Sequence, residues 1–152
     1  ASIGPFSLHI ITPPAYHLHK SAEYNEGQEG HRNEEDVMPV FNNRTPQYAE
    51  QVEGGIGRMQ RDRLLEGDQL GGICSYVAQI SLEPGCSIGI HQHVGDSEMY
   101  FITAGTATYT ENDVEYHVEK GDVLYCPDGS FHGILNSGND MLSFVAVIQK
   151  SE

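Results

Sequence analysis

The sequence predicts an all-β fold, a sandwich or barrel built from short strands. Between Gly72 and the C-terminus, β-rich segments follow one another at regular spacing, with turn signals between them. No stretch of ordinary helix length carries the apolar period of an amphipathic helix. The chain has 152 residues, of which 38% are hydrophobic, so it is long enough for one domain with its own core.

The first part of the chain predicts little regular structure. Residues 1–45 are expected to be an irregular N-terminal arm, because their polar, Glu- and Gly-rich centre has neither a helical nor a strand period. Residues 46–152 are expected to form a single domain. Within it, residues 58–65 are predicted as a strand or extended segment that places Arg61 and Arg63 on one face.

Eight further strands are expected after Gly72, most of them ended by a turn signal. Glu111-Asn112-Asp113 is typical of a hairpin turn, and Pro127-Asp128-Gly129 marks another turn. The expected strands cover residues 73–82, 87–93, 98–104, 106–110, 114–118, 123–126, 131–136 and 141–149.

Charge and cysteine content limit the partners and the compartment. Lys plus Arg number 8 and Asp plus Glu number 22, a net charge of −14. Nucleic acid and anionic membrane surfaces need a positive footprint, so we expect neither as a partner. No apolar stretch approaches the roughly 20 residues that span a bilayer. Three cysteines without a C-x-x-C spacing, and no readable signal peptide, predict a reducing, cytoplasmic location.

A candidate metal site lies between residues 85 and 98. His91 and His93 are two residues apart, so on a strand their side chains point to the same face. Glu98 follows after a short loop, and a hairpin would return it beside the two imidazoles. With the later His132, the set offers three imidazoles and one carboxylate, which suit one divalent transition metal such as Mn, Fe, Ni, Zn or Cu.

Scattered surface histidines are the alternative interpretation. The pair His17 and His19 fits that alternative, because it has no carboxylate at hairpin distance. His91 and His93 differ from it in the spacing of the residues around them.

That spacing resembles the two motifs of the cupin superfamily. The first motif, G-x5-H-x-H-x4-E-x6-G, is matched by Gly85, His91, His93, Glu98 and Gly105. The second, G-x5-P-x-G-x2-H-x3-N, is matched by Gly121, Pro127, Gly129, His132 and Asn136. The resemblance covers residues 72–149. It implies a jelly-roll barrel, the cupin double-stranded β-helix, with a metal in its mouth bound by His91, His93, Glu98 and His132. Asn136 is expected to satisfy backbone groups of a loop.

Strand alternation predicts what else lines the metal pocket. Five residues share a face with the inward Glu98 or His132, namely Tyr100, Ile102, Ala104, Ser130 and Ile134. Tyr100 is the candidate catalytic residue, as a proton donor or as a hydrogen bond to the substrate; a plain wall residue is the alternative. Tyr76 and Gln79 lie on opposite faces of one strand, so only one of them looks inward.

The distribution of arginine bears on the ligand. Residues 70–152 contain no Arg and hold two Lys against 11 acidic residues, a net charge of −9. We therefore expect a neutral or singly charged molecule with oxygen atoms for the metal, such as a hydroxy or keto acid or an enediol. A dicarboxylate such as oxalate becomes the expectation if a guanidinium reaches the mouth from Arg44, Arg58, Arg61 or Arg63. A charged edge strand is the alternative role for these residues.

Three classes of function stay open. Four metal ligands favour an enzyme of decarboxylase, dioxygenase or isomerase type over a sensor or binding module for a sugar or small acid. A structural protein would not need all four ligands. The outward-facing pair Met99 and Phe101 predicts burial against a second copy, and hence a homodimer.

Overall fold

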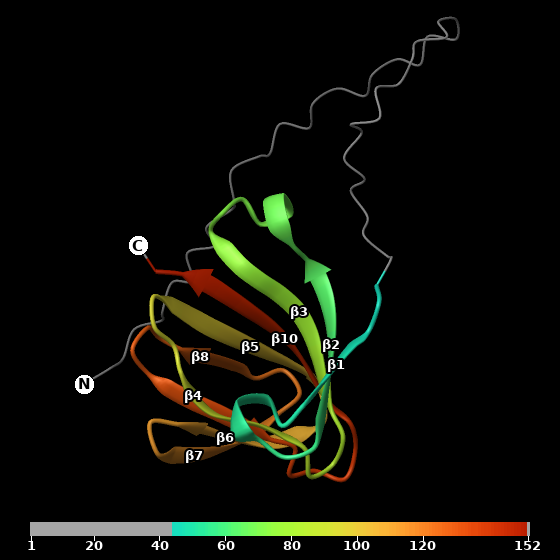
Figure 1. Cartoon of the computed structure of the whole chain (residues 1–152). Helices are drawn as coiled ribbons and strands as arrows, with labels where there is room; N and C mark the ends of the chain where they lie inside the picture. Colours follow the sequence, from blue (N-terminus) through green and yellow to red (C-terminus); the bar gives the residue numbers. More distant parts are fainter. Residues whose placement is uncertain (1–43, 152) are drawn as a thin grey trace, which may run out of the picture. The chain divides into compact units, whose positions relative to one another are not determined.

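Two antiparallel sheets face each other in the computed structural model, which describes residues 44–151 (Figure 1). The six-stranded sheet has the order β1 (Gln47–Glu50), β2 (Arg58–Leu65), β3 (Cys74–Leu82), β10 (Leu142–Lys150), β5 (Asp96–Ala104) and β8 (Val123–Cys126). The four-stranded sheet has the order β4 (Ser87–Gln92), β9 (Phe131–Leu135), β6 (Thr106–Glu111) and β7 (Val114–Glu119). Two short 3-10 helices connect the first three strands: η1 (Val52–Gly54) lies between β1 and β2, and η2 (Gly67–Leu70) lies between β2 and β3.

The all-β jelly roll is confirmed, and every strand predicted between residues 58 and 149 is present, with ends shifted by no more than two residues. A short strand expected over residues 7–12 lies outside the described residues. Within residues 44–151 the two sheets share no strand, so the expected barrel is a sandwich of two sheets. The arm expected over residues 1–45 lies outside the described residues, apart from its last two.

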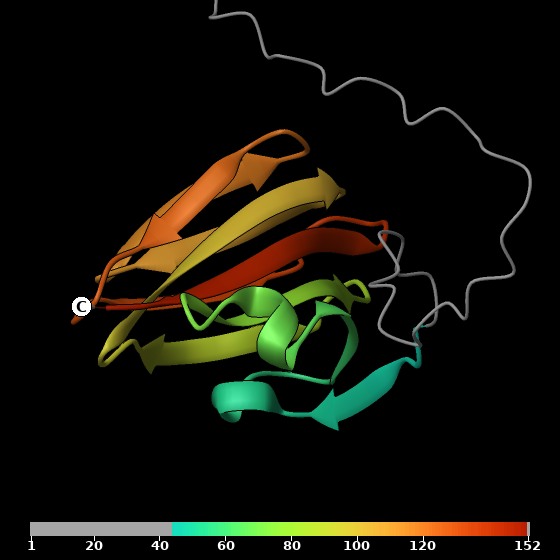
Figure 2. The same cartoon turned by 90° about the horizontal axis from the view of Figure 1, so that it is seen from above.

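The strand β1 was not predicted. It is four residues long, forms the outer edge of the larger sheet and pairs only with β2 (Figure 2). Most of its residues are exposed, so the sequence has no apolar alternation there to indicate a strand. The pairing sets Gln47 directly opposite Arg61.

Side chains from both sheets fill the space between them. Phe144, Leu82 and Ile102 of the larger sheet are fully buried, and Ile134 of the smaller sheet belongs to the same cluster. Burying a side chain of this size stabilises the fold by about 1.5–3 kcal/mol. This core therefore holds the two sheets together around the site described below.

The loop before β10 depends on the buried amide of Asn136. Its Nδ2 donates hydrogen bonds to the carbonyls of Leu82 and Asp140, at 2.8 and 2.9 Å. Its Oδ1 accepts one from the backbone N–H of Gly138 at 3.1 Å. The expected role of this motif residue, satisfying backbone groups of a loop, is thus confirmed.

Two turns show the backbone that their sequences predict. Asn112 and Asp113, between β6 and β7, have φ values of 46° and 68°, as a tight hairpin requires. Gly105, between β5 and β6, has φ 82°, and a Cβ there would lie 2.7 Å from the carbonyl oxygen of Met141. Only glycine fits that position without a shift of the neighbouring backbone.

The inward orientation expected for Ala104 is wrong. In the pairing of β5 with β10, Ala104 lies opposite Ser143 and Ile102 opposite Phe144, so Thr103 is an extra residue on β5. Such a bulge breaks the alternation of faces, and Ala104 is exposed.

No helix among the described residues is long and apolar enough to cross a membrane. The cytoplasmic location stays a prediction.

Candidate metal centre

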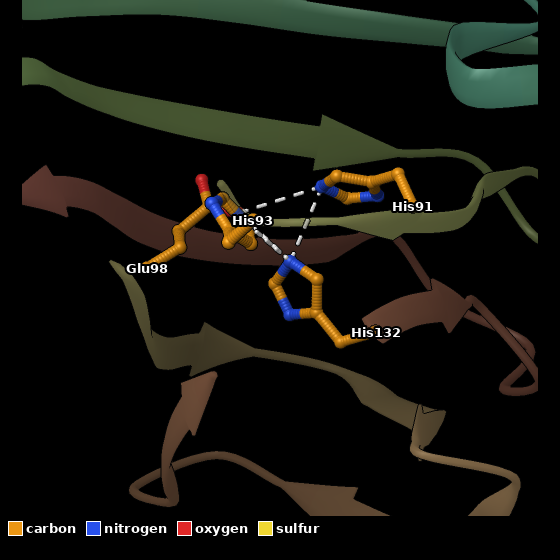
Figure 3. Close-up of side chains that lie close together, drawn as sticks. All are labelled: His91, His93, Glu98 and His132. Carbon is orange, nitrogen blue, oxygen red and sulfur yellow. Dashed lines mark hydrogen bonds and ion pairs between the residues drawn. The ribbon is translucent and has the colours of Figure 1, made fainter. Parts of the chain in front are cut away.

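Three strands and one loop bring His91, His93, Glu98 and His132 together (Figure 3). His91, near the end of β4, is the ladder partner of His132 on β9, and His93 follows β4 directly. Glu98 comes from β5 in the other sheet. The cluster thus bridges the two sheets, and one possible ligand atom from each residue lies within 4.8 Å of all the others.

The interior of the cluster is crowded with nitrogen atoms. Nε2 of His132 lies 3.0 Å from Nε2 of His93 and 3.2 Å from Nε2 of His91. Oε2 of Glu98 lies 3.1 Å from His132 Nε2, 3.3 Å from His93 Nε2 and 3.9 Å from His91 Nε2. All four side chains therefore direct one polar atom toward a common point.

The outer nitrogen of each imidazole also has a partner. Nδ1 of His91 lies 3.0 Å from the carbonyl oxygen of Gly89, so it must carry the proton and donate. Nδ1 of His93 lies 2.7 Å from the carboxylate of Asp96, and Nδ1 of His132 lies 3.2 Å from the hydroxyl of Tyr109.

This arrangement fits a bound metal ion. A neutral imidazole that donates from Nδ1 presents the lone pair of Nε2, and such outer partners commonly fix the histidine ligands of metals. Four ligand atoms placed about 2.1 Å from one ion lie roughly 3–4 Å apart, close to the spacings seen between these residues. Three imidazoles and a carboxylate suit a divalent transition metal.

Electrostatics keep the carboxylate of Glu98 ready to bind a cation. Burial alone would raise its pKa, but hydrogen bonds from His132 and His93 lower the pKa to about 2. The hydrogen bond to Glu98 raises the pKa of His93, and a second bond to Asp96 adds to this effect. Burial lowers the pKa of His132, which favours its neutral, metal-binding form.

The cluster opens into a cavity of about 310 Å³. His91, His93 and Glu98 line one part of it, and His132, which is 1% exposed, lies buried beneath. Tyr100 also lines the cavity, with its ring stacked on that of His132 at 5.1 Å between centroids. Burial, with the nearby carboxylate of Glu98, raises the pKa of Tyr100, so its phenol keeps its proton.

Arg61 and Arg63 line the same cavity. The ground for expecting a neutral or singly charged ligand, a pocket without guanidinium groups, therefore does not hold. Arg58 on the same strand lies elsewhere, stacked over the ring of Tyr48 and 4.0 Å from Glu83. Of Tyr76 and Gln79, it is Tyr76 that faces the cavity.

Two further expectations about the lining are corrected. Ser130 does not line the cavity, because it lies before β9 begins and its hydroxyl accepts a hydrogen bond from Asn112 at 3.3 Å. Ile102 and Ile134 do point inward, but they belong to the core between the sheets rather than to the cavity wall.

Sequence reasoning missed the turn that carries η1. Val52 and Glu53 from this turn line the cavity. The turn packs backbone to backbone on β4, because a Cβ at Gly89 would collide with the carbonyl of Glu53. Gly89 also orients His91, since its own carbonyl accepts the hydrogen bond from Nδ1. The cluster of glycines at 54–57 was the only signal of this close contact.

Comparison with known proteins identifies relatives of this chain. The family model described as a cupin domain matches residues 78–148. An oxalate-binding protein of Thermotoga maritima is 34% identical over 104 residues, which are 68% of this chain and 86% of that protein. A germin-like protein of Morus alba is 36% identical over 76 residues, 46% of this chain and 36% of that protein.

A solved structure agrees with the sequence relatives. The crystal structure of a predicted oxalate decarboxylase from Thermotoga maritima superposes with a TM-score of 0.70 at 32% sequence identity. It covers 71% of this chain and 94% of the other. The likeness thus extends over nearly the whole of that protein.

Proposed function

Because the chain belongs to the cupin family, we propose that it is a metal-dependent enzyme acting on a small organic acid. The observation that carries this proposal is the convergence of His91, His93, Glu98 and His132 at the end of a cavity that also contains arginines. Structural or storage roles need neither feature.

A divalent ion held by these four residues would act as a Lewis acid toward the oxygen atoms of the acid. The protein's own part would be to hold the four ligand side chains in position and to limit the water around them. The partners of the three Nδ1 atoms hold the imidazoles in place, and the apolar walls formed by Ile80, Ile88 and Ile148 limit access.

Decarboxylation is the reaction type that we propose. The bond between the leaving carboxylate and its neighbouring carbon breaks, the electron pair stays on that carbon, and a proton replaces the lost CO₂. The step consumes no oxidant. Tyr100 is the proposed proton donor, because its phenol is protonated and lines the cavity. The name of the similar Thermotoga structure, a predicted oxalate decarboxylase, supports this type.

Turnover of a panel of acids tests the proposal. Protein loaded in turn with Mn, Fe, Ni, Zn and Cu is given oxalate, hydroxy acids and keto acids, and released CO₂ is measured. We expect CO₂ from at least one acid with one metal, and a loss of activity of about 10²–10⁴-fold in Tyr100→Phe. No CO₂ from any combination, with metal bound in full, would contradict an enzyme of this type.

Binding without turnover is the second candidate function. It is favoured by the name of the relative, an oxalate-binding protein. The two functions separate in the experiment above, since a binding protein would take up an acid stoichiometrically and return it unchanged.

We also propose a homodimer through the outer face of β5 and β8. Phe101 and Val123 are cross-strand neighbours there, and Met99 lies opposite Tyr125. Phe101, Val123 and Tyr125 are 41%, 61% and 57% exposed, so the chain alone leaves an apolar face to water. Light scattering at micromolar concentration should give the mass of two chains, and Phe101→Asp should give one. A matched control is Val114→Asp on β7, and a monomeric wild-type protein would end this proposal.

A further inference from the structure

We infer that the cavity binds a dicarboxylate longer than oxalate, with one carboxylate at the His/Glu cluster and the other at Arg61 and Arg63. The inference rests on the proposed function in one respect, the metal at the cluster. Its new content is the distance between two separate positive poles.

The register of the larger sheet places the backbones that carry the two poles on strands three steps apart. Arg63 on β2 is paired with Ala78 on β3, Ala78 with Ala146 on β10, and Ala146 with Tyr100 on β5. Neighbouring strands lie about 4.8 Å apart, so three steps separate the backbones of Arg63 and Tyr100 by roughly 14 Å. Glu98 lies two residues from Tyr100, on the same face of the same strand.

Small side chains lie between the two poles. Ala146 lines the cavity and Ala78 is buried beside it, and these two positions between Arg63 and Tyr100 carry only a methyl group each. Larger residues such as Ile80 and Ile148 line the cavity on either side of this row. The cavity can therefore take an extended molecule with an apolar middle. In oxalate a single C–C bond joins the two carboxylates, so the molecule is too short to span both poles and would stay at one of them.

The arginines are held in place without losing their charge. Both guanidinium groups stack over the ring of Tyr76, at 5.9 Å for Arg61 and 5.5 Å for Arg63. Arg61 donates to the neutral side-chain carbonyl of Gln47 at 2.7 and 3.1 Å. Neither contact neutralises a guanidinium.

Of these two arginines, only Arg63 has an acidic partner among the described residues, and that contact is weak. Its ion pair with Glu66 spans 3.8 Å between a partly exposed and an exposed side chain, and pairs of this kind contribute about 1 kcal/mol or less. A ligand carboxylate can take its place at little cost.

The charges facing the cavity match a dianion. Among the residues that line the cavity, Glu53 at the exposed rim and Glu98 in the cluster balance the two guanidinium groups, and Glu66 lies outside the lining. A divalent ion at the cluster then leaves a surplus of two positive charges. A dicarboxylate neutralises that surplus, and one carboxylate group alone does not.

Calorimetry with the metal-loaded full chain tests the inference without requiring turnover. The probes are acetate, oxalate, malonate, succinate and glutarate, in Mn-loaded protein with metal content checked before and after. We expect Arg61→Gln and Arg63→Gln each to weaken succinate or glutarate at least tenfold. Oxalate and acetate should change less than threefold, and metal content should stay at one per chain. Arg58→Gln, on the same strand but outside the cavity, is the matched control.

The contrary outcomes are distinct. If the arginine variants weaken oxalate as much as succinate, or weaken neither, the second pole is refuted while the metal-dependent function stands. If the wild-type protein binds metal but no acid of the series, the inference is refuted as well. Failure to retain metal would instead overturn the proposed function.

Discussion

Two regions of the chain line one cavity and contribute different side chains to it. The motif-bearing region, residues 72–149, supplies the three imidazoles and the carboxylate of the cluster. The N-terminal strands β1 and β2 supply Arg61, Arg63 and the Gln47 that holds Arg61. Residues 70–152 have no arginine at all. On our proposal the motif region provides the metal site, and the segment outside the motifs selects the anion bound beside it.

The two sets of residues are held in place by separate contacts. The cluster depends on spacings within neighbouring strands and on buried partners such as Asp96 and Tyr109. The arginines lie near the edge of the larger sheet, where only β1 pairs beyond them. Changes in β2 can alter the ligand without disturbing the cluster, because the two poles share no side-chain contact in the described residues.

The largest effect is expected from the motif region itself. In His91→Ala, His93→Ala the cluster keeps only Glu98 and His132, so metal content should fall from one ion per chain to nearly none. Mass spectrometry of the dialysed protein measures it. His117→Ala, which removes an exposed histidine of β7, is the control and should keep its metal. Full stoichiometry in the double variant would show that the cluster is not the site.

Acid should release the metal through one histidine first. The pKa of His93 is raised, so in metal-free protein its protonated pairing with Glu98 stabilises the fold at low pH and is lost as pH rises through that pKa. The ionised carboxylate of Glu98 stabilises the fold fully above the ordinary carboxyl pKa. This stabilisation is lost as pH falls through the folded pKa of about 2. Metal binding needs neutral His93, whose raised pKa lies above the ordinary value of about 6.5. As pH is lowered, the apparent metal affinity should therefore begin to fall before pH 6.5 is reached, by about tenfold per pH unit. Competition with a chelator measures it.

A variant that lacks one cause of the raised pKa of His93 sharpens the measurement of metal affinity against pH. Asp96 also raises the pKa of His93, so Asp96→Asn should move the fall in affinity to lower pH. A metal affinity that stays constant between pH 8 and 6 in the wild-type protein would contradict the role of His93.

The contact between the two regions is expected to have a smaller effect. In Gly89→Ala the new methyl group meets the carbonyl of Glu53, so the η1 turn must move away from β4. We expect the free energy of unfolding to fall by about 1–3 kcal/mol, as for other overpacked sites. Urea denaturation measures it. Ile90→Ala, at an exposed neighbour, should change little, and an equal loss in both variants would argue against the contact.

The smallest effect concerns the outer partner of His132. Tyr109→Phe removes the hydroxyl that lies 3.2 Å from Nδ1 while keeping the ring. Metal affinity should fall by about tenfold, at the low end for such outer partners. An unchanged affinity would mean that packing alone orients His132.

Local spacing explains why so much of the cluster and of the strand order could be predicted. His91 and His93 share a face by the period of two, and the hairpin turn at Asn112 and Asp113 depends on nearby residues alone. The bulge at Thr103, which exposes Ala104, depends on pairing with β10 far along the chain. The position of Arg61 and Arg63 over the cavity likewise depends on the register of β2 with β3, which no local pattern reveals.

The central claim is that one divalent ion lies between His91, His93, Glu98 and His132. Anomalous X-ray diffraction from crystals of protein purified without added metal tests it most directly. We predict one peak per chain, at roughly 2.0–2.2 Å from Nε2 of each imidazole and from a carboxylate oxygen of Glu98. A metal peak elsewhere, or a fully formed cluster that stays empty after soaking in each candidate metal, would contradict the claim.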